Sequence, residues 1–465
     1  MAFRFFGFRG LCGLILLVVF TLGFSLGCGT VVTQSDNNSG IDDDSLPLNQ
    51  VKIGIDYDPS VRCSDQGTVA GAVACMPQAS FADCGDPTSE DNLSGCPDRC
   101  LNCFDTDLQN IQSQLGVTEL TVYQPNYYIA KAAQQNSLKI ILGTCDDFIT
   151  ALAAPSGQET CTICGSPSLC GSDAAESLIN GSCRGTTPWD PTQFCEAKCK
   201  SGFPCTNGDC SCTGDSQCGG TSGSCDLRGY YPAFKDYLSD GTVLGIQLGN
   251  EVLSASVDGQ PLTKAQVLAA AKVLRDTLNS STNNLSNIPI IVSLQVGNEQ
   301  HFCENGLPPA NVDKIAAHPY CNDVASVPPM WPLESGNSND TAAEDCASQV
   351  WQLFQDNAQK YCGADKVFIG ETGYNTGCPG VGAETTHLAV APLFVDKILG
   401  KACTMEVPLF LFEYADVCPA GGCLPGCPSQ PNLGNGYFGI YHTDAYGTKG
   451  GVSLKYASTP SLQCP

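Results

Sequence analysis

The chain has 465 residues, with 47 acidic and 22 basic side chains and a formal net charge of −25. This acidity argues against nucleic acid and anionic membrane surfaces as partners, because both would repel the protein, whereas a neutral ligand carries no such penalty. Hydrophobic residues make up 42% of the chain, which excludes a largely disordered protein.

Residues 1–27 have the features of a secretory signal peptide. Arg4 and Arg9 precede a long, uncharged and almost wholly apolar run that ends in small residues. Residues 28–49 are polar and acidic, which predicts a solvated linker. We therefore expect a secreted, cell-surface or cell-wall protein. Cys28 loosely resembles the lipid-bearing cysteine of bacterial lipoproteins, so lipid anchoring there is an alternative.

The chain contains 30 cysteines, far more than a reducing compartment tolerates, which also indicates export. The pairs Cys100-x-x-Cys103 and Cys161-x-x-Cys164 fit either disulfides or zinc and redox sites. Zinc knuckles usually include histidines at matched spacing, however, and the chain has only four histidines. We expect disulfides of unspecified connectivity, with no metal and no cofactor.

From residue 51 onward, short apolar strands alternate with helical stretches. In chain order, the predicted strands span 51–57, 119–123, 138–142, 242–248, 288–296, 314–318, 366–369 and 407–412, and the predicted helices span 107–115, 128–135, 231–238, 264–278, 342–361 and 387–399. The apolar runs are continuous rather than alternating, as in parallel strands that are buried on both faces. Eight such strands predict an α/β fold, a (β/α)8 TIM barrel over residues 50–465.

Two cysteine-rich stretches, at about 60–104 and 158–228, interrupt this rhythm. The second is rich in Gly, Ser and Cys, so we expect it to bury little apolar surface and to need crosslinks to hold its shape. Both are interpreted as disulfide-rich insertions in the loops that follow barrel strands. The alternative is a separate cysteine-rich binding module inserted in the barrel.

Two glutamates follow predicted strands at the end of the barrel where such enzymes carry their catalytic groups. Glu251 follows the fourth strand and Glu371 the seventh. A carboxylate directly after a buried strand is costly unless it has a partner or a task, and each one taken singly fits an ordinary ion pair. Together they favour glycoside hydrolysis, in which one carboxylic acid protonates the leaving oxygen and the other carboxylate acts on the anomeric carbon. Asn250 is placed to donate its amide to a sugar hydroxyl.

Several segments, in this order, resemble the family 17 glycoside hydrolases, which are β-1,3-glucanases and glucanosyltransferases. The similar segments are Val51–Tyr57, Thr121–Gly143, Gly249–Leu253, Ala317–Tyr320, Ile369–Tyr374, Phe412–Asp416 and Asn435–Tyr441. The resemblance covers most of the chain from residue 51 to 454, apart from the two cysteine-rich stretches.

This resemblance implies a retaining mechanism in which Glu251 is the acid/base and Glu371 the nucleophile. It also implies a set of substrate-binding residues. In that set, aromatic rings pack against sugars, His318 and Tyr320 line the floor of the site, and two acids help to set the ionisation of the nucleophile. The remaining members are the tyrosines Tyr57, Tyr123 and Tyr374 and the acids Glu413 and Asp416.

The expected partner is a β-glucan polysaccharide or oligosaccharide, with no nucleic acid and no nucleotide cofactor, and the chain is expected to be a monomer. Hydrolysis and glucanosyl transfer both remain open, because the outcome depends on whether water or a sugar intercepts the glycosyl-enzyme. Activity on a different β-glycan is a second alternative. The third is a non-catalytic glucan-binding surface protein.

Overall fold

The computed structural model describes residues 53–57, most of 104–180, 198–199, 225–226, most of 234–321, 338–376, 384–419, 438–443 and most of 452–464. The chain divides into two units, Met1–Asp43 and Asp44–Pro465, and every described residue belongs to the second. The predicted signal peptide, the linker and nearly all of the first cysteine-rich stretch lie outside these residues. Within them, no helix combines the length and apolarity that crossing a membrane requires.

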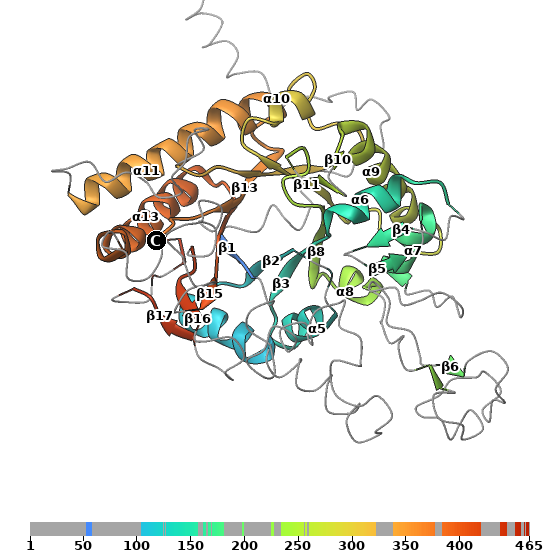
Figure 1. Cartoon of the computed structure of the whole chain (residues 1–465), viewed down its shortest axis with the longest axis horizontal. Helices are drawn as coiled ribbons and strands as arrows, with labels where there is room; N and C mark the ends of the chain where they lie inside the picture. Colours follow the sequence, from blue (N-terminus) through green and yellow to red (C-terminus); the bar gives the residue numbers. More distant parts are fainter. Residues whose placement is uncertain are drawn as a thin grey trace, which may run out of the picture. The chain divides into compact units, whose positions relative to one another are not determined.

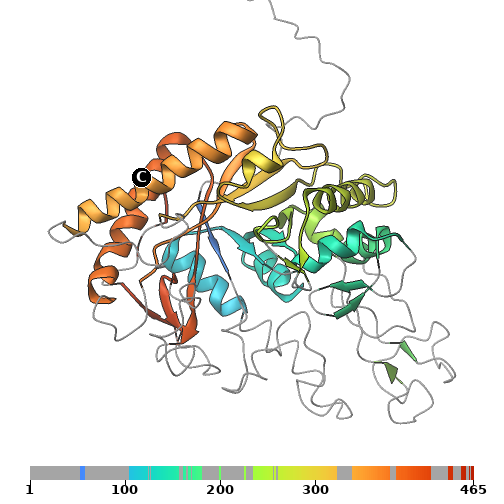
Figure 2. The same cartoon turned by 45° about the horizontal axis from the view of Figure 1, so that its top comes forward.

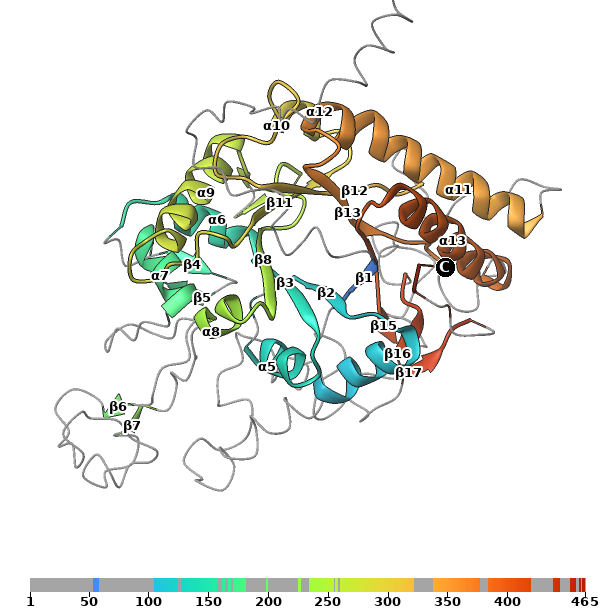
Figure 3. The same cartoon turned by 180° about the vertical axis from the view of Figure 1, so that it is seen from behind.

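Eight parallel strands close into a barrel, so the predicted (β/α)8 architecture is confirmed (Figure 1). Each predicted strand overlaps one barrel strand. The ring closes where the first strand, shown in blue in Figures 2 and 3, pairs with the last. In chain order the barrel strands are β1 (Ile53–Asp56), β2 (Glu119–Val122), β3 (Lys139–Gly143), β8 (Val243–Leu248), β11 (Ile290–Gln295), β12 (Lys314–His318), β13 (Val367–Thr372) and β14 (Leu409–Leu411).

Helices surround the barrel, and local sequence signals explain where the longest of them begin (Figure 1). Thr263 and Gln266 form a capping box at the start of α9, and the Ser338 side chain caps α11. The helices between and after the barrel strands are η6 (Ile111–Leu115), α5 (Tyr127–Gln135), α6 (Asp146–Ala153), α7 (Ser172–Asn180), α8 (Lys235–Ser239), α9 (Lys264–Leu278), α10 (Glu299–Phe302), α11 (Asn339–Phe354), η8 (Gln355–Gln359), α12 (Lys360–Cys362) and α13 (Glu384–Met405).

Three of these helices, α6, α7 and α10, were not predicted. Helix α7 falls inside the stretch 158–228, which was expected to bury little apolar surface. Four of its side chains are nonetheless fully buried and belong to the main core: Ala174, Ala175, Leu178 and Ile179. Their spacing places them on one face of a helix, and α7 packs against α6 and α9. Over residues 172–180 the stretch is therefore part of the barrel's helical layer.

Short strand pairs outside the barrel complete the described secondary structure. Four pairings are antiparallel hairpin-like contacts, and one pairing, between β15 and β16, is parallel. These strands are β4 (Cys161–Ile163), β5 (Ser166–Ser168), β6 (Lys198–Cys199), β7 (Cys225–Asp226), β9 (Ser256–Val257), β10 (Gln260–Pro261), β15 (Ala415–Pro419), β16 (Tyr441–Thr443) and β17 (Val452–Leu454).

The barrel interior changes from apolar to polar toward the carboxyl ends of its strands. One interior cluster combines side chains of six strands: Ile141, Leu244, Ile291, Ala316, Phe368 and Phe410. Gly54 faces the same interior, since a Cβ atom there would lie 2.2 Å from the Phe410 ring. Asp56, Ser293 and His318 stand two residues beyond Gly54, Ile291 and Ala316. Because strand side chains alternate between faces, these three also point inward and form a polar layer at this mouth.

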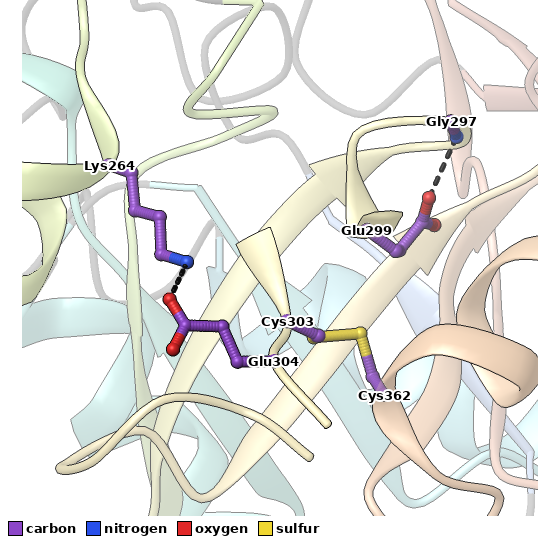
Figure 4. The surroundings of a disulfide bond; sticks show 6 residues. All are labelled: Lys264, Gly297, Glu299, Cys303, Glu304 and Cys362. Carbon is purple, nitrogen blue, oxygen red and sulfur yellow. Dashed lines mark hydrogen bonds and ion pairs between the residues drawn. A yellow bond between two sulfur atoms is a disulfide. The ribbon is translucent and has the colours of Figure 1, made fainter. Parts of the chain in front are cut away.

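Disulfides are present, as predicted, and three of the four described bonds join elements of the barrel layer itself. The bond between Cys303 and Cys362 connects the ends of α10 and α12 beside the ion pair of Lys264 with Glu304 (Figure 4). The other bonds are Cys161–Cys170, Cys321–Cys346 and Cys403–Cys464. Of these four, only Cys161–Cys170 lies in a stretch that was predicted to be cysteine-rich.

Candidate active site

Glu251 stands on a tight turn directly after β8. Gly249 and Glu251 have φ values of +64° and +49°, in the left-handed region that residues other than glycine rarely adopt. Asp146 Oδ1 accepts a hydrogen bond from the Asn250 backbone N–H at 2.9 Å, and Ser293 Oγ accepts one from the Glu251 N–H at 3.1 Å. Strained backbone of this kind concentrates at functional sites.

Glu251 and Glu371 meet at one nitrogen atom of His318. The Nδ1 atom of this histidine lies 3.1 Å from Glu371 Oε2 and 3.5 Å from Glu251 Oε1. Because both oxygens contact the same atom at these distances, they are at most 6.6 Å apart. Two carboxyl groups about 5–5.5 Å apart are typical of retaining glycosidases, whereas inverting enzymes separate them by about 6.5–9.5 Å.

Three side chains surround the carboxylate of Glu371. The hydroxyl of Tyr123 donates to Oε2 at 3.1 Å, the hydroxyl of Tyr320 donates to Oε1 at 2.5 Å, and His318 contacts Oε2. Burial raises the pKa of Glu371, the charge of Glu251 adds to this effect, and His318 and the two tyrosine hydroxyls oppose it by stabilising the ionised form. Glu371 is thus a buried carboxylate held by directed donors.

Ser293 fixes the orientation of three neighbouring groups. Its hydroxyl donates to Asn250 Oδ1 at 3.1 Å, accepts from the Glu251 N–H, and lies 3.0 Å from His318 Nε2. Since the single hydroxyl proton goes to Asn250, we assign a proton to His318 Nε2, which donates it to Ser293. Nδ1 is then the nitrogen that faces the two glutamates, and the Asn250 amide presents its NH2 group as a donor.

A group of half-buried aromatic rings lies beside the carboxylates. Tyr123 packs against Phe412, Phe412 against Phe438, and Phe438 against Tyr320, with ring centroids 5.3 to 6.3 Å apart. Each ring keeps part of its surface exposed. Sugar rings have C–H faces that suit such aromatic surfaces.

Two of the three tyrosines predicted to bind sugar point away from this site, which corrects the prediction. Tyr57 is fully buried on the outer face of β1, and its hydroxyl donates to Asp107 at 2.9 Å. Tyr374 is 3% exposed, and its hydroxyl lies 3.1 Å from Nδ1 of His387 on α13. Neither ring has a surface to offer a substrate.

Of the two acids predicted to lie near the nucleophile, the structure describes the side chain of one. Glu413 is 1% exposed, and its charge is among the causes that raise the pKa of Tyr123, so it lies close to the hydroxyls around Glu371. The side chain of Asp416, in β15, lies outside the described residues.

Sequence reasoning missed four residues of this site. Asp56 and Ser293 are polar residues inside otherwise apolar strands, and that interruption is the signal that could have revealed them. Phe412 and Phe438 belong to segments that were quoted for the family resemblance, but no pattern in those segments distinguishes a ring at the barrel mouth from a ring in the core.

Replacing Gly249 by alanine is expected to damage both stability and activity. The new Cβ atom would lie 2.6 Å from Asp146 Oδ1, 2.7 Å from Val252 and 2.8 Å from Ile149 at a left-handed φ. We expect a loss of about 2–4 kcal/mol of stability from backbone strain and overlap, and a fall in kcat/KM of about a hundredfold as the Glu251 turn shifts. Thermal melting and steady-state kinetics measure these losses.

Gly306→Ala is the matched control for this variant, because Gly306 has φ +79° but no atom within 4 Å of its added Cβ. It carries the backbone cost of about 1–2 kcal/mol without the overlap or the effect on activity. Equal losses in the two variants would show that the contacts around Gly249 do not position the turn.

Comparison with known proteins gives no family assignment. No family model matches the chain, and no curated protein matches it. Among solved structures, an endo-laminarinase from a Formosa strain is 13% identical over 86% of this chain and 85% of its own, with a TM-score of 0.45. A β-1,3-glucanase and allergen of Cryptomeria japonica pollen is 12% identical over 89% and 100%, with a TM-score of 0.42.

A family 5 xyloglucanase from Paenibacillus pabuli is 12% identical over 88% of this chain and 96% of its own, with a TM-score of 0.40. These identities and TM-scores are too low to support a choice of family or substrate. The barrel is established by its own strand order, and the chemistry has to be argued from the site.

Proposed function

We propose that this chain is a retaining glycosidase that acts on β-1,3-glucan, with Glu371 as nucleophile and Glu251 as acid/base. The observation that carries the proposal is the contact of both carboxylates with His318 Nδ1, which keeps their facing oxygens within 6.6 Å of each other at the mouth of the barrel. Such a separation leaves room for one glycosidic bond between an attacking carboxylate and a proton donor.

The surroundings of the two glutamates favour this division of roles. The Glu371 side chain is 10% exposed and accepts from Tyr123 and Tyr320, so it is oriented for attack on the anomeric carbon. The Glu251 side chain is 31% exposed, as an acid/base requires, since it must exchange protons with a leaving group and then with water.

In the first step, Glu371 forms a bond to the anomeric carbon while Glu251 gives its proton to the leaving oxygen. In the second step, Glu251 takes a proton from the incoming water or sugar hydroxyl, which displaces Glu371 from the anomeric carbon. His318 contacts both carboxylates and stabilises the ionised form of Glu371. The Asn250 amide is available to the sugar hydroxyl next to the reacting carbon.

The substrate class follows from charge and from the family resemblance. A neutral glucan is compatible with the net charge of −25, and the aromatic group of Tyr123, Tyr320, Phe412 and Phe438 suits sugar faces. The β-1,3 linkage depends on the resemblance to family 17 alone. Export of the chain likewise remains part of the proposal, supported by its N-terminal pattern and by its disulfides.

The proposal is tested by following a laminari-oligosaccharide by proton NMR as it is cleaved. We expect the β-anomer to form first, and we expect laminarin to be cleaved faster than mixed-linkage glucan or carboxymethylcellulose. An α-anomer as first product would exclude the retaining mechanism. Binding without cleavage of any of the three would instead favour the glucan-binding alternative, and products longer than the input would identify glucanosyl transfer.

Removing the Tyr320 hydroxyl is expected to shift the pH dependence of the enzyme. This hydroxyl lowers the pKa of Glu371, so Tyr320→Phe raises that pKa. The nucleophile must be ionised, and therefore the acidic limb of kcat/KM moves to higher pH. At the optimum we expect kcat/KM to fall about tenfold to a hundredfold, because a hydrogen bond to a charged group is lost.

The matched control is Tyr374→Phe, since Tyr374 bonds His387 rather than a glutamate of the site. Its acidic limb should coincide with that of the parent. A Tyr320→Phe profile that also coincides with the parent would contradict the placement of Tyr320 on the nucleophile.

A further inference from the structure

A third carboxyl group, which the proposed mechanism does not use, lies in the polar layer of the barrel interior. Asp56 ends β1, is fully buried, and pairs in register with Thr121 of β2. It points into the barrel, because Gly54, two residues earlier, faces the interior ring of Phe410. Asp56 therefore shares the layer of His318, just inside the mouth that carries the two catalytic glutamates.

The groups around Asp56 come from β2, from β13 and from the segments that follow β2, β12 and β14. The hydroxyls of Thr121 and Tyr123 are near enough to lower the pKa of Asp56, the charge of Glu371 raises it, and the charge of Asp56 in turn raises the pKa of Tyr320. In the segment that follows β14, the Tyr414 N–H donates to the backbone oxygen of Asp56 at 3.0 Å, so Glu413 is one residue from this contact.

An ionised Asp56 would be costly in this environment. Neither of its oxygens makes a hydrogen bond of ordinary geometry, and both are buried. Burial and the nearby charge of Glu371 raise the pKa of Asp56 well above its usual value, and the two hydroxyls oppose this only in part.

The single proton of Tyr123 links Asp56 to the nucleophile. A tyrosine hydroxyl has one proton to donate, and here it goes to Glu371 Oε2 at 3.1 Å. A carboxylate at Asp56 would compete with Glu371 for that proton. A carboxylic acid at Asp56 would instead donate to the Tyr123 oxygen and leave the proton directed at Glu371.

We propose that Asp56 is a positioning residue that keeps its carboxyl proton at working pH and, by a turn of its carboxyl group, donates it to Tyr123, which directs the Tyr123 hydroxyl onto Glu371. The consequence for catalysis rests on the function proposed above, whereas the protonation state does not. The two can therefore be tested separately.

Infrared difference spectroscopy at neutral pH, between the parent chain and Asp56→Asn, tests the protonation state without any substrate. We expect the parent to show the C=O stretch of a buried carboxylic acid that the variant lacks. If the variant instead lacked a carboxylate band of the parent, Asp56 would be ionised in the parent, and this result would overturn the proposal. If Asp56→Asn does not fold, Thr121→Val serves instead, because loss of the neighbouring hydroxyl should shift the frequency of the same acid band, and the absence of any acid band in the parent would overturn the proposal.

Kinetics of Asp56→Asn and Asp56→Leu test the positioning role. Asparagine and leucine have side chains of the same branched shape, but only the asparagine amide can donate to Tyr123, so we expect Asp56→Asn to retain about tenfold more kcat/KM than Asp56→Leu. In the pH profile of kcat/KM, the acidic limb of Asp56→Asn should coincide with that of the parent, because the substitution of a protonated Asp56 removes no charge. Movement of that limb to lower pH would show that Asp56 is ionised in the parent and would overturn the proposal.

The two failures are distinguishable. An inactive parent chain with an intact acid band would refute the proposed function while leaving the protonated Asp56 in place. An active enzyme whose acid band is missing would refute only the role of Asp56.

Discussion

Glu371→Gln is expected to lower kcat on laminarin by about 10⁴- to 10⁶-fold, because a neutral amide cannot form the bond to the anomeric carbon. The fold should survive, since glutamine has the size of glutamate, its amide oxygen accepts from one of the two tyrosines, and its NH2 group can donate to the hydroxyl oxygen of the other. The release of reducing ends over long incubations measures the loss of kcat relative to the parent. The melting temperature, measured in parallel, shows whether the fold survives.

Glu304→Gln is the matched control for this experiment. Glu304 is a surface carboxylate, 69% exposed, that pairs with Lys264 and contacts neither Glu251 nor Glu371 among the described interactions, and its replacement should leave turnover unchanged. If Glu371→Gln kept activity within a few-fold of the parent, the nucleophile assignment would be wrong, whatever the control showed.

The second large effect is expected at Glu251, where the loss depends on the leaving group. Glu251→Ala should lower kcat/KM on glucan about 10²- to 10⁴-fold, because the leaving sugar oxygen then departs without a proton. An aryl β-glucoside with an acidic phenol leaves without that help, so its first step should be nearly preserved and the glycosyl-enzyme should accumulate.

Added azide distinguishes this role from a structural one. A small anion attacks the accumulated glycosyl-enzyme without needing a base, so azide should restore turnover of the aryl glycoside and yield the β-glycosyl azide. Retained activity on glucan, or an α-glycosyl azide, would contradict Glu251 as acid/base. The product anomer is read by NMR.

The barrel was predictable from sequence because each strand leaves a continuous apolar run, and eight such runs separated by helical stretches have few other arrangements. That the two glutamates meet at one end of the barrel was predictable for a related reason. Glu251 follows β8 and Glu371 lies near the end of β13, and a charge at the end of a buried strand is costly without a partner or a task. Ser293 and Asp56 are likewise polar residues in buried strands, and this property could have marked them as site residues.

The orientation of individual side chains was not predictable. A strand buried on both faces has no polar alternation, so its sequence does not reveal which residues face the barrel interior and which face the helices. For this reason Tyr57 was expected at the substrate, whereas the structure places it outside the barrel against Asp107 and turns its neighbour Asp56 inward. Tyr123, which faces the interior, contacts Glu371.

Helix α7 was missed because cysteines and small residues around it dominate the local composition. The apolar residues of α7 number only four, but their spacing on one face is enough once α9 supplies a surface to pack against. Tertiary contacts of this kind cannot be read from a short window of sequence.

The most direct test of the account is to trap the covalent intermediate. A laminaribiosyl donor with fluorine at C2 and a reactive leaving group forms the glycosyl-enzyme but slows its breakdown, so mass spectrometry of proteolytic peptides can locate the label. We expect one label per chain, on Glu371. A label on Glu251, Glu413 or another residue, or unlabelled enzyme that continues to turn over glucan, would contradict the assignment.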